Sequence, residues 1–281
     1  MLEGYVTDEK KQGLFYLCQE EKVRSRKLYE KVFLEDSVRF VDYYYTYKVK
    51  DNRILVLLKN GEIVSMLHRN PYTMIVNGYE VSVDYIVAVA TREDCRHQGY
   101  MRSLLERALQ DMNAAEIPFA FLMPASESIY APFDFVWICP YTNLPPRVMR
   151  MDAEAQNYYL ASHYQMFCKR DARYMENLKA QQEAEAGEEI PDKMPPFMAR
   201  ITDVCQMLQL ISGSREQILY LRVRDSVIQQ NDGYYCWKVS SDCSKVVRML
   251  KCPEKIDMDL TIGELTSLIF SGFDICLSEI V

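Results

Sequence analysis

The segment at residues 83–101 decides the fold, and its sequence is VDYIVAVATREDCRHQGYM. The run from Ile86 to Ala90 is apolar at every position, as expected of a strand buried on both faces in the middle of a sheet. A helix follows the loop, because apolar residues recur there at helical spacing. They are Met101, Leu104, Leu105, Ala108, Leu109 and Met112. A buried strand that leads through a short loop into an amphipathic helix indicates a sheet flanked by helices.

The start of this helix has the chemistry of an anion site. Gly99 lies in the first turn, where the lack of a side chain lets a ligand approach the backbone. Free amides and the positive end of the helix dipole attract a phosphate, and Arg96 adds a positive charge. A pyrophosphate fits such a site, although ordinary α/β proteins contain the same arrangement. The chain lacks a Walker Gly-x4-Gly-Lys loop and a Gly-x-Gly-x-x-Gly fingerprint, which disfavours nucleotide hydrolysis and hydride transfer.

The residues before this segment mix helix and strand. Residues 20–33 have a helical pattern. Two Asn-Gly pairs, Asn60-Gly61 and Asn77-Gly78, predict hairpin turns between strands at 53–58, 62–68, 72–76 and 79–91. The order of elements therefore predicts a mixed α+β sheet with helices on its faces.

The length of 281 residues favours two units rather than one. We expect a first unit over residues 1–150, a helical bridge with an acidic and proline-rich linker over 151–196, and a smaller α+β unit over 197–281. Residues 152–180 contain neither Pro nor Gly and predict one helix, and 181–197 carries the acidic residues and prolines of the linker. In the last unit, Thr261 and Glu264 form a capping box before an apolar helix.

Composition narrows the function classes. Hydrophobic residues make up 49% of the chain and the formal net charge is −7, which suits a globular protein and disfavours broad binding to nucleic acid or an anionic membrane. No apolar run approaches the ~18 residues of a membrane-spanning helix. Nine scattered cysteines without a Cys-x-x-Cys pair indicate a reducing cytoplasm. The three histidines have no metal-ligand spacing, so we expect no metal.

Two motifs in the right order resemble the GCN5-related N-acetyltransferases (GNAT) over residues 20–140. The first is Arg96-x-x-Gly99-x-Met101 after the VAVAT strand, which resembles the pyrophosphate loop of that family. The second is Tyr130 followed by Phe133-Asp134-Phe135, which resembles the family's Tyr-x-x-Phe-Gly-Phe ending. Two positions depart from the pattern: Met101 replaces a small residue, and Asp134 replaces a glycine.

The resemblance implies a GNAT fold and direct attack of an amine on the thioester of acetyl-CoA. Tyr130 would protonate the leaving thiolate, and the strand would splay at 87–89 to expose backbone groups to the pantetheine arm. An amide there would also stabilise the oxyanion. The implied cofactor-binding residues are Val87, Ala88, Val89, Arg96, His97, Gln98, Gly99, Tyr100, Met101, Ala125 and Ser126. An exposed His97 at a helix start without a phosphate contact is the alternative for that residue.

The whole chain resembles a shortened relative of the enhanced intracellular survival (Eis) acetyltransferases, which carry a C-terminal domain like sterol carrier proteins. In those relatives the terminal carboxylate reaches the active site, which here implies the α-carboxylate of Val281 as base or orienting group. An unperturbed carboxyl terminus is about 9 kcal/mol too weak a base for simple abstraction from an alkylammonium ion. Glu127 and Asp84 are the alternatives.

The sequence therefore predicts a cytoplasmic N-acetyltransferase that acts on a primary amine of a small cationic substrate, such as an aminoglycoside or polyamine, or on a lysine. Direct transfer is preferred to an acyl intermediate on Cys95, since no His/Asp arrangement supports one. The alternative is a catalytically weak acyl-CoA-binding or ligand-binding module, which Met101 and Asp134 would favour. We expect no nucleic-acid or membrane partner, and a homo-oligomer stays open.

Overall fold

The computed structural model describes residues 12–187, 194–241 and 244–280. Within these ranges the chain forms a nine-stranded sheet and a four-stranded sheet. The large sheet contains β1 (Gln12–Tyr16), β2 (Arg53–Lys59), β3 (Glu62–Val76), β4 (Tyr79–Thr91), β5 (Phe119–Leu122), β6 (Val136–Cys139), β7 (Met166–Cys168), β8 (Phe197–Ile201) and β13 (Ile275–Cys276). The small sheet contains β9 (Gln217–Arg224), β10 (Gly233–Val239), β11 (Lys245–Met249) and β12 (Met258–Thr261).

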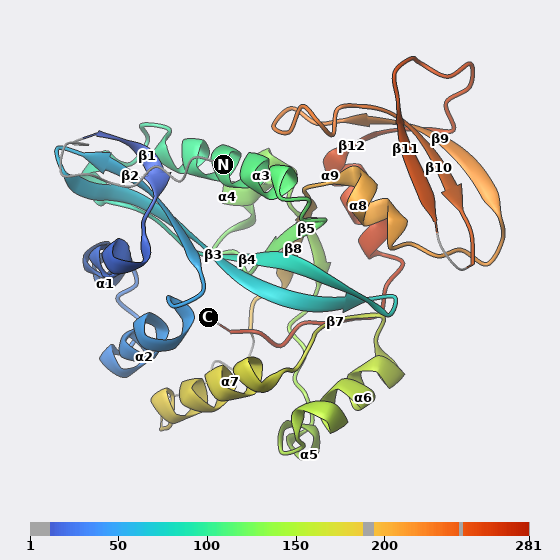
Figure 1. The fold of residues 1–281 in the computed structure, drawn as a ribbon. Coiled ribbons are helices and arrows are strands. Elements are labelled where there is room, and N and C mark those ends of the chain that lie inside the picture. The colour runs from blue at the N-terminus through green and yellow to red at the C-terminus, as the bar shows by residue number, and fades with distance from the viewer. Residues whose placement is uncertain (1–11, 188–193, 242–243, 281) are drawn as a thin grey trace.

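Helices cover both faces of the large sheet (Figure 1). The helical elements before β6 are η1 (Gln19–Ser25), α1 (Arg26–Val32), α2 (Val38–Tyr43), the π-helical turn η2 (Tyr44–Lys48), η3 (Glu93–Cys95), α3 (Tyr100–Ala114), α4 (Glu127–Tyr130) and η4 (Ala131–Phe133). Those after β6 are α5 (Pro146–Met149), α6 (Ala153–His163), α7 (Ala172–Ala184), α8 (Val204–Gln209) and α9 (Ile262–Phe270). Helix α3 lies on one face, and α1, α2 and α7 lie on the other. The predicted mixed α+β fold is confirmed.

The strand order of the large sheet is β1-β2-β3-β4-β5-β8-β6, and β4 and β5 are parallel. Both Asn-Gly pairs make the predicted hairpin turns, with positive φ at Asn60, Gly61, Asn77 and Gly78. Two successive residues with positive φ match the right-handed twist of the strands they connect.

The predicted single helix over residues 152–180 is wrong. The chain forms α6, then the three-residue strand β7, then α7. Strand β7 pairs with the far end of the long strand β3, at Met74, Ile75 and Val76, and with β13. Pairing with distant strands outweighs local helix preference here, and Asp171 begins α7 by accepting a hydrogen bond from the Tyr174 amide at 2.7 Å.

The boundary between the two sheets lies later than the sequence suggested. Residues 197–201 were expected to begin the C-terminal unit, but β8 lies between β5 and β6 in the large sheet. The small sheet with α8 follows, and the capping box at Thr261 and Glu264 begins α9 as predicted. The chain then returns to the large sheet through β13. Residues 188–193 of the predicted linker lie outside the described residues.

None of the helices within the described ranges has the length and apolar content needed to cross a lipid bilayer.

Candidate functional site

The parallel strands β4 and β5 separate after a short contact. They pair only at Asp84 with Ala120 and at Tyr85 with Phe121. Beyond Tyr85, strand β4 continues beside β3 through a register shift near Ala88, whose φ is +49°. A bulge of this kind bends the strand and leaves backbone groups without a ladder partner. The predicted splay at Val87, Ala88 and Val89 therefore coincides with an observed bulge at the end of the β4–β5 pairing.

The loop that follows β4 presents backbone amides at the start of α3. His97 and Gly99 both have left-handed conformations, with φ of +62° and +78°. Gly99 is the N-cap residue, and no side chain caps the helix there. The first-turn amides of a helix have no partner inside the helix, so they face the loop as donors. A Cβ at Gly99 would meet no atom within 4 Å, so this position needs glycine because of its φ and not for lack of space.

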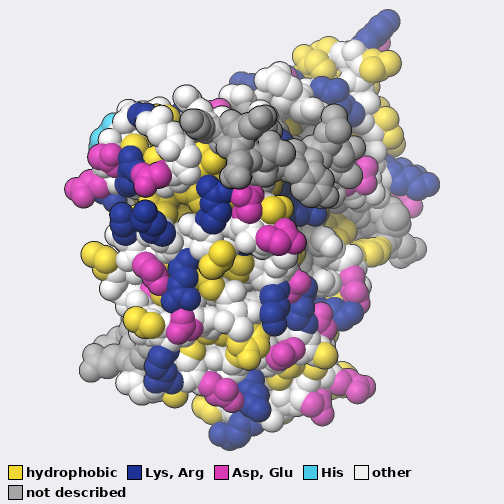
Figure 2. All heavy atoms as spheres, turned by 60° about the vertical axis from the view of Figure 1, so that its left-hand side comes forward, with side chains coloured by type: hydrophobic (Ala, Val, Ile, Leu, Met, Phe, Trp, Pro, Cys, Tyr) yellow, Lys and Arg dark blue, Asp and Glu magenta, His cyan; other side chains and the backbone are white. Residues whose placement is uncertain are grey.

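The side chains of Arg96, His97 and Gln98 in this loop are exposed. Arg96 contacts the Thr91 carbonyl at 3.4 Å through Nε, and the Tyr100 hydroxyl donates to Gln98 at 2.8 Å. Acidic and basic side chains are interspersed over the face shown in Figure 2, and neither sign forms a broad patch there. The amides at the start of α3 are therefore a local feature that suits a phosphate group without a broad basic patch on this face (Figure 2).

Tyr130 lies at the end of α4, the short helix that follows β5. Ala125 and Ser126 are exposed in the short connection from β5 to α4, and Tyr130 is the last residue of that helix. Its ring is buried and lies 5.9 Å from the ring of Phe135, measured between centroids. Burial raises the pKa of Tyr130 to about 12. No hydrogen bond among the described residues occupies its hydroxyl, so the proton is free for a ligand.

The two departures from the GNAT motifs keep the local geometry. Asp134 has φ +60°, so it takes the left-handed position where the motif has glycine, and Asp tolerates that conformation better than most residues. Met101 packs its side chain against the hydrophobic core at the first turn of α3. Neither residue removes an amide or a hydroxyl that the site needs.

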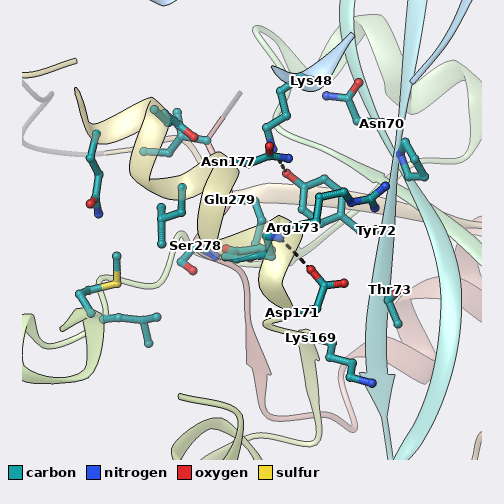
Figure 3. A pocket seen from close by; sticks show the side chains of 18 of the residues that line it. Lys48, Asn70, Tyr72, Thr73, Lys169, Asp171, Arg173, Asn177, Ser278 and Glu279 are labelled. Atoms are coloured by element: carbon teal, nitrogen blue, oxygen red, sulfur yellow. Dashed lines mark hydrogen bonds between the residues drawn. The ribbon is translucent and has the colours of Figure 1, made fainter. Parts of the chain in front are cut away.

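A cavity of about 240 Å³ lies on the opposite side of the sheet from α3, between η2, β3, α7 and the last described residues of the chain (Figure 3). Its polar lining includes Lys48, Asn70, Tyr72, Thr73, Lys169, Asp171, Arg173, Asn177, Ser278 and Glu279. This volume is below the ~300–1,000 Å³ of pockets for drug-sized ligands, so the cavity suits a small molecule or the end of a larger one.

An aromatic layer connects the cavity with the point where β4 and β5 separate. The ring of Tyr72, which lines the cavity, lies 6.1 Å from the rings of both Tyr85 and Phe121. Tyr85 and Phe121 are the last strand pair and stack at 4.7 Å. Burial, followed by neighbouring groups that include Glu279 and Tyr130, raises the pKa of Tyr85. The cavity and Tyr130 therefore both lie near the strand separation.

Glu279 is a functional candidate that the sequence did not indicate. Its carboxylate is buried and accepts hydrogen bonds at 2.8 Å from Arg170, the Tyr174 hydroxyl and the Ser278 amide. No motif marks this residue, because its two side-chain partners, Arg170 and Tyr174, lie more than 100 positions away in the sequence. The Asp171 cap of α7 was the only local signal for the structure that surrounds it.

The structure separates the carboxylates that were considered as bases. Asp84 is buried in an ion pair with Arg69, whose Nη2 lies 2.6 Å from Oδ2, and it does not line the cavity. Glu127 is exposed in the first turn of α4. Val281 lies outside the described residues, and Ile280 before it lines the cavity.

Within the described part of the chain, no three His, Cys, Asp or Glu side chains converge in a way that could hold a metal ion.

The sequence of each unit matches a known domain family. Residues 16–138 match the acetyltransferase (GNAT) domain, and residues 204–276 match the sterol carrier protein domain. No curated protein sequence matches the chain.

Solved structures share the fold over almost the whole chain. A probable N-acyltransferase of unknown function from Enterococcus faecalis is similar with a TM-score of 0.67 and 13% identity, covering 92% of this chain and 89% of that one. A GCN5-related N-acetyltransferase from Anabaena variabilis has a TM-score of 0.63 and 14% identity, covering 92% and 90%. Eis1 from Mycobacterium abscessus has a TM-score of 0.61 and 13% identity, covering 92% and 90%.

The first unit therefore has the GNAT fold, and the second has the sheet and helices of a sterol-carrier-protein-like domain, as the sequence predicted. Together with the GNAT domain match, this fold supports an acetyl-CoA-dependent N-acetyltransferase. At these low sequence identities, similarity to the solved structures establishes only the fold.

Proposed function

We propose that this chain transfers the acetyl group of acetyl-CoA directly to a primary amine, between the separated ends of β4 and β5. The observation that carries the proposal is the combination of the bulge at Ala88 with the amides at the start of α3. The bulge offers backbone groups to a pantetheine arm, and the helix start offers donors and a positive dipole to a pyrophosphate. Both lie on one continuous strand, loop and helix.

Cofactor binding in this proposal uses two groups of residues. Val87, Ala88 and Val89 contact the pantetheine arm, and an amide of this group donates to the oxyanion of the tetrahedral intermediate. The pyrophosphate is held at the loop by Arg96, His97, Gln98, Gly99, Tyr100 and Met101. Ala125 and Ser126 lie beside the cofactor after β5. The open space around Gly99 and the exposed side chains of Arg96, His97, Gln98, Ala125 and Ser126 support this assignment.

In the transfer step, the amine nitrogen attacks the thioester carbonyl and the C–S bond then breaks. Tyr130 donates to the departing sulfur, so the thiol leaves uncharged or hydrogen-bonded. The acceptor enters from the cavity beside Tyr72, and its excess proton leaves to water or to a carboxylate. For that carboxylate we propose the α-carboxylate of Val281, because Glu279 and Ile280 line the cavity.

The expected acceptors are small cationic amines, such as aminoglycosides or polyamines, or a lysine. We further propose a relationship to the Eis acetyltransferases, which the order of the two units and the span of the Eis1 likeness support. We also propose a cytoplasmic location, which the free thiols of the described cysteines support. No observation favours the weak acyl-CoA-binding module, since Asp134 and Met101 keep the local geometry.

The test is release of free thiol from acetyl-CoA across a panel of primary amines, with CoA binding measured in parallel by calorimetry. We expect amine-dependent thiol release. CoA binding without thiol release for any amine would overturn the enzyme and favour a binding module. Absence of CoA binding would overturn the cofactor assignment as well. Extending the chain by several residues after Val281 tests the terminal carboxylate, and unchanged turnover would exclude it.

A further inference from the structure

The side chain of Lys48 lines the cavity. Among the described residues, Lys48 has no carboxylate within ion-pair distance, and its Nζ donates to the Tyr72 hydroxyl at 2.8 Å. The ammonium also lies 5.0 Å from the centroid of the Tyr72 ring. Figure 3 shows the Lys48 and Tyr72 side chains meeting at the cavity. Because Tyr72 accepts the proton of Lys48, its own hydroxyl hydrogen points elsewhere and can be donated.

A second donor lines the same cavity without a partner. The Nδ2 atom of Asn70 is buried and makes no hydrogen bond among the described residues. Asn70 and Tyr72 are two positions apart on β3, so both side chains point to the same face. An amide donor without an acceptor in a buried place costs free energy, which a ligand oxygen would recover once the Asn70 amide turns toward the cavity.

The fold positions these groups together. Tyr44 and Lys48 begin and end the π-helical turn η2, whose closing bond joins the Val49 amide to the Tyr44 carbonyl. Tyr44 donates to Asn70 at 3.5 Å, and Lys48 donates to Tyr72. Two residues of one turn therefore contact two residues of one strand face. π-Helical turns are frequent at functional sites.

Several charges that line the cavity already have partners. Asp51 pairs with Arg173 at 3.1 Å, Glu279 pairs with Arg170 at 2.8 Å, and Lys169 pairs with Glu80. Asp171 caps α7. Glu185, another lining carboxylate, accepts a hydrogen bond from Gln181 at 3.0 Å. Lys48 is therefore the lining cation without an ion-pair partner among the described residues, and an anionic ligand group can pair with it.

We propose that Lys48, Asn70 and Tyr72 form a carboxylate-binding subsite, so that the acceptor is a primary amine that also carries a carboxylate. This inference rests on the proposed acetyl transfer and narrows its acceptor class. A carboxylate accepts about four hydrogen bonds, so it can take the ammonium, the amide and the hydroxyl together. A free amino acid or the carboxyl end of a peptide has this chemistry, whereas a polyamine lacks it.

The experiment compares three amines that differ only at the carboxylate: lysine, lysinamide and 1,5-diaminopentane. We expect kcat/KM for lysine to exceed the values for the other two by at least about tenfold. Lys48→Met should lower kcat/KM for lysine by a similar factor and leave the values for lysinamide and 1,5-diaminopentane unchanged. Lys48→Arg should keep part of the preference, because arginine also binds carboxylates. Lys50→Met, which removes an exposed lysine outside the cavity, is the control.

Equal rates on all three amines, or an equal loss on all three in Lys48→Met, would overturn the subsite while acetyl transfer stands. If no amine is turned over, calorimetry with Nε-acetyl-lysine and its amide separates the two proposals. Binding of the acid alone, lost in Lys48→Met, supports the subsite without the transfer. Absence of binding would overturn the subsite.

Discussion

The hydroxyl of Tyr130 is a hydrogen-bond donor that stays protonated throughout the working pH range. Burial raises its pKa to about 12, so ionisation does not compete with donation near neutral pH. Full proton transfer to a thiolate whose conjugate acid has a pKa near ~8.5 is then uphill by roughly 5 kcal/mol. In the proposed mechanism, Tyr130 would therefore stabilise the departing sulfur mainly by a hydrogen bond, or by transfer concerted with C–S cleavage.

Replacing this donor tests its role. Tyr130→Phe should lower kcat by about 100-fold, the usual effect of losing one donor to a developing charge, and change the KM for acetyl-CoA little. Steady-state thiol release measures both constants. The control is Tyr158→Phe, which removes the hydroxyl of an exposed tyrosine on α6. A kcat of Tyr130→Phe within threefold of the unmodified protein would contradict the assignment.

His68 is buried, and its protonation makes the free energy of unfolding depend on pH. Burial lowers its pKa to about 3, and its Nδ1 forms a hydrogen bond of 2.9 Å with the Tyr44 hydroxyl. In the unfolded chain the pKa is near ~6.5, so the unfolded state binds the additional proton below that pH. Stability is therefore fully present above about pH 6.5 and falls as the pH decreases toward 3.

When the pH is lowered from 6.5 to 5, protonation of His68 in the unfolded state should decrease the free energy of unfolding by roughly 2 kcal/mol. His68→Asn keeps a hydrogen-bonding group for Tyr44 and should remove that component, even if it is less stable at pH 7. Urea unfolding at both pH values measures the difference, and His163→Asn, at an exposed histidine, should retain the full pH dependence. Identical pH dependence in His68→Asn and the unmodified protein would exclude His68 as its source.

At the scale of elements, the proposed anion site depends on the left-handed conformation of Gly99 before α3. Gly99→Ala introduces strain of about 1–2 kcal/mol, which the loop relieves by turning its amides away. We expect the Kd for CoA to rise at least fivefold, measured by calorimetry. Gly61→Ala is the matched control, because Gly61 has a similar φ of +80° and equally open space in a hairpin turn. Equal CoA affinity in both variants would argue against phosphate binding at this loop.

Elements with a local signature could be predicted, and elements formed by distant pairing could not. The segment at 83–101 carries its own apolar pattern and glycine, and both Asn-Gly turns carry their φ requirement. Strand β7 carries no such signal, because it exists through pairing with β3 and β13. Strand β8 likewise belongs to the large sheet only because β5 and β6 flank it.

The residues of the candidate site likewise fall into those that local motifs predict and those that only the fold brings together. The proposed pyrophosphate loop and Tyr130 belong to motifs of a few residues, so the sequence alone predicts them as site residues. Lys48, Asn70 and Glu279 lie in three separate parts of the chain, and only the fold brings them to one cavity. The sequence does not show that these polar side chains lie together, because η2, β3 and residues 278–280 meet only in the fold.

At the scale of the whole molecule, a buried ion pair joins the two sheets. Arg200 on β8 lies 2.7 Å from Asp225, the residue after β9, and both side chains are fully buried. Arg200→Met should destabilise the protein by about 3–5 kcal/mol, because it leaves a buried carboxylate without its cation. Arg224→Met removes the exposed pair with Asp259 and should cost at most about 1 kcal/mol. Urea unfolding measures both, and equal midpoints would contradict a structural role for the buried pair.

Direct acetyl transfer is the central claim, and a single-turnover reaction with isotope-labelled acetyl-CoA and lysine tests it most directly. Mass spectrometry of both the protein and the amine follows the label. We predict that the label passes to the amine and that the protein mass stays unchanged with or without lysine. Label retained on the protein, for example at Cys95, or free labelled acetate without acetylated lysine, would contradict direct transfer.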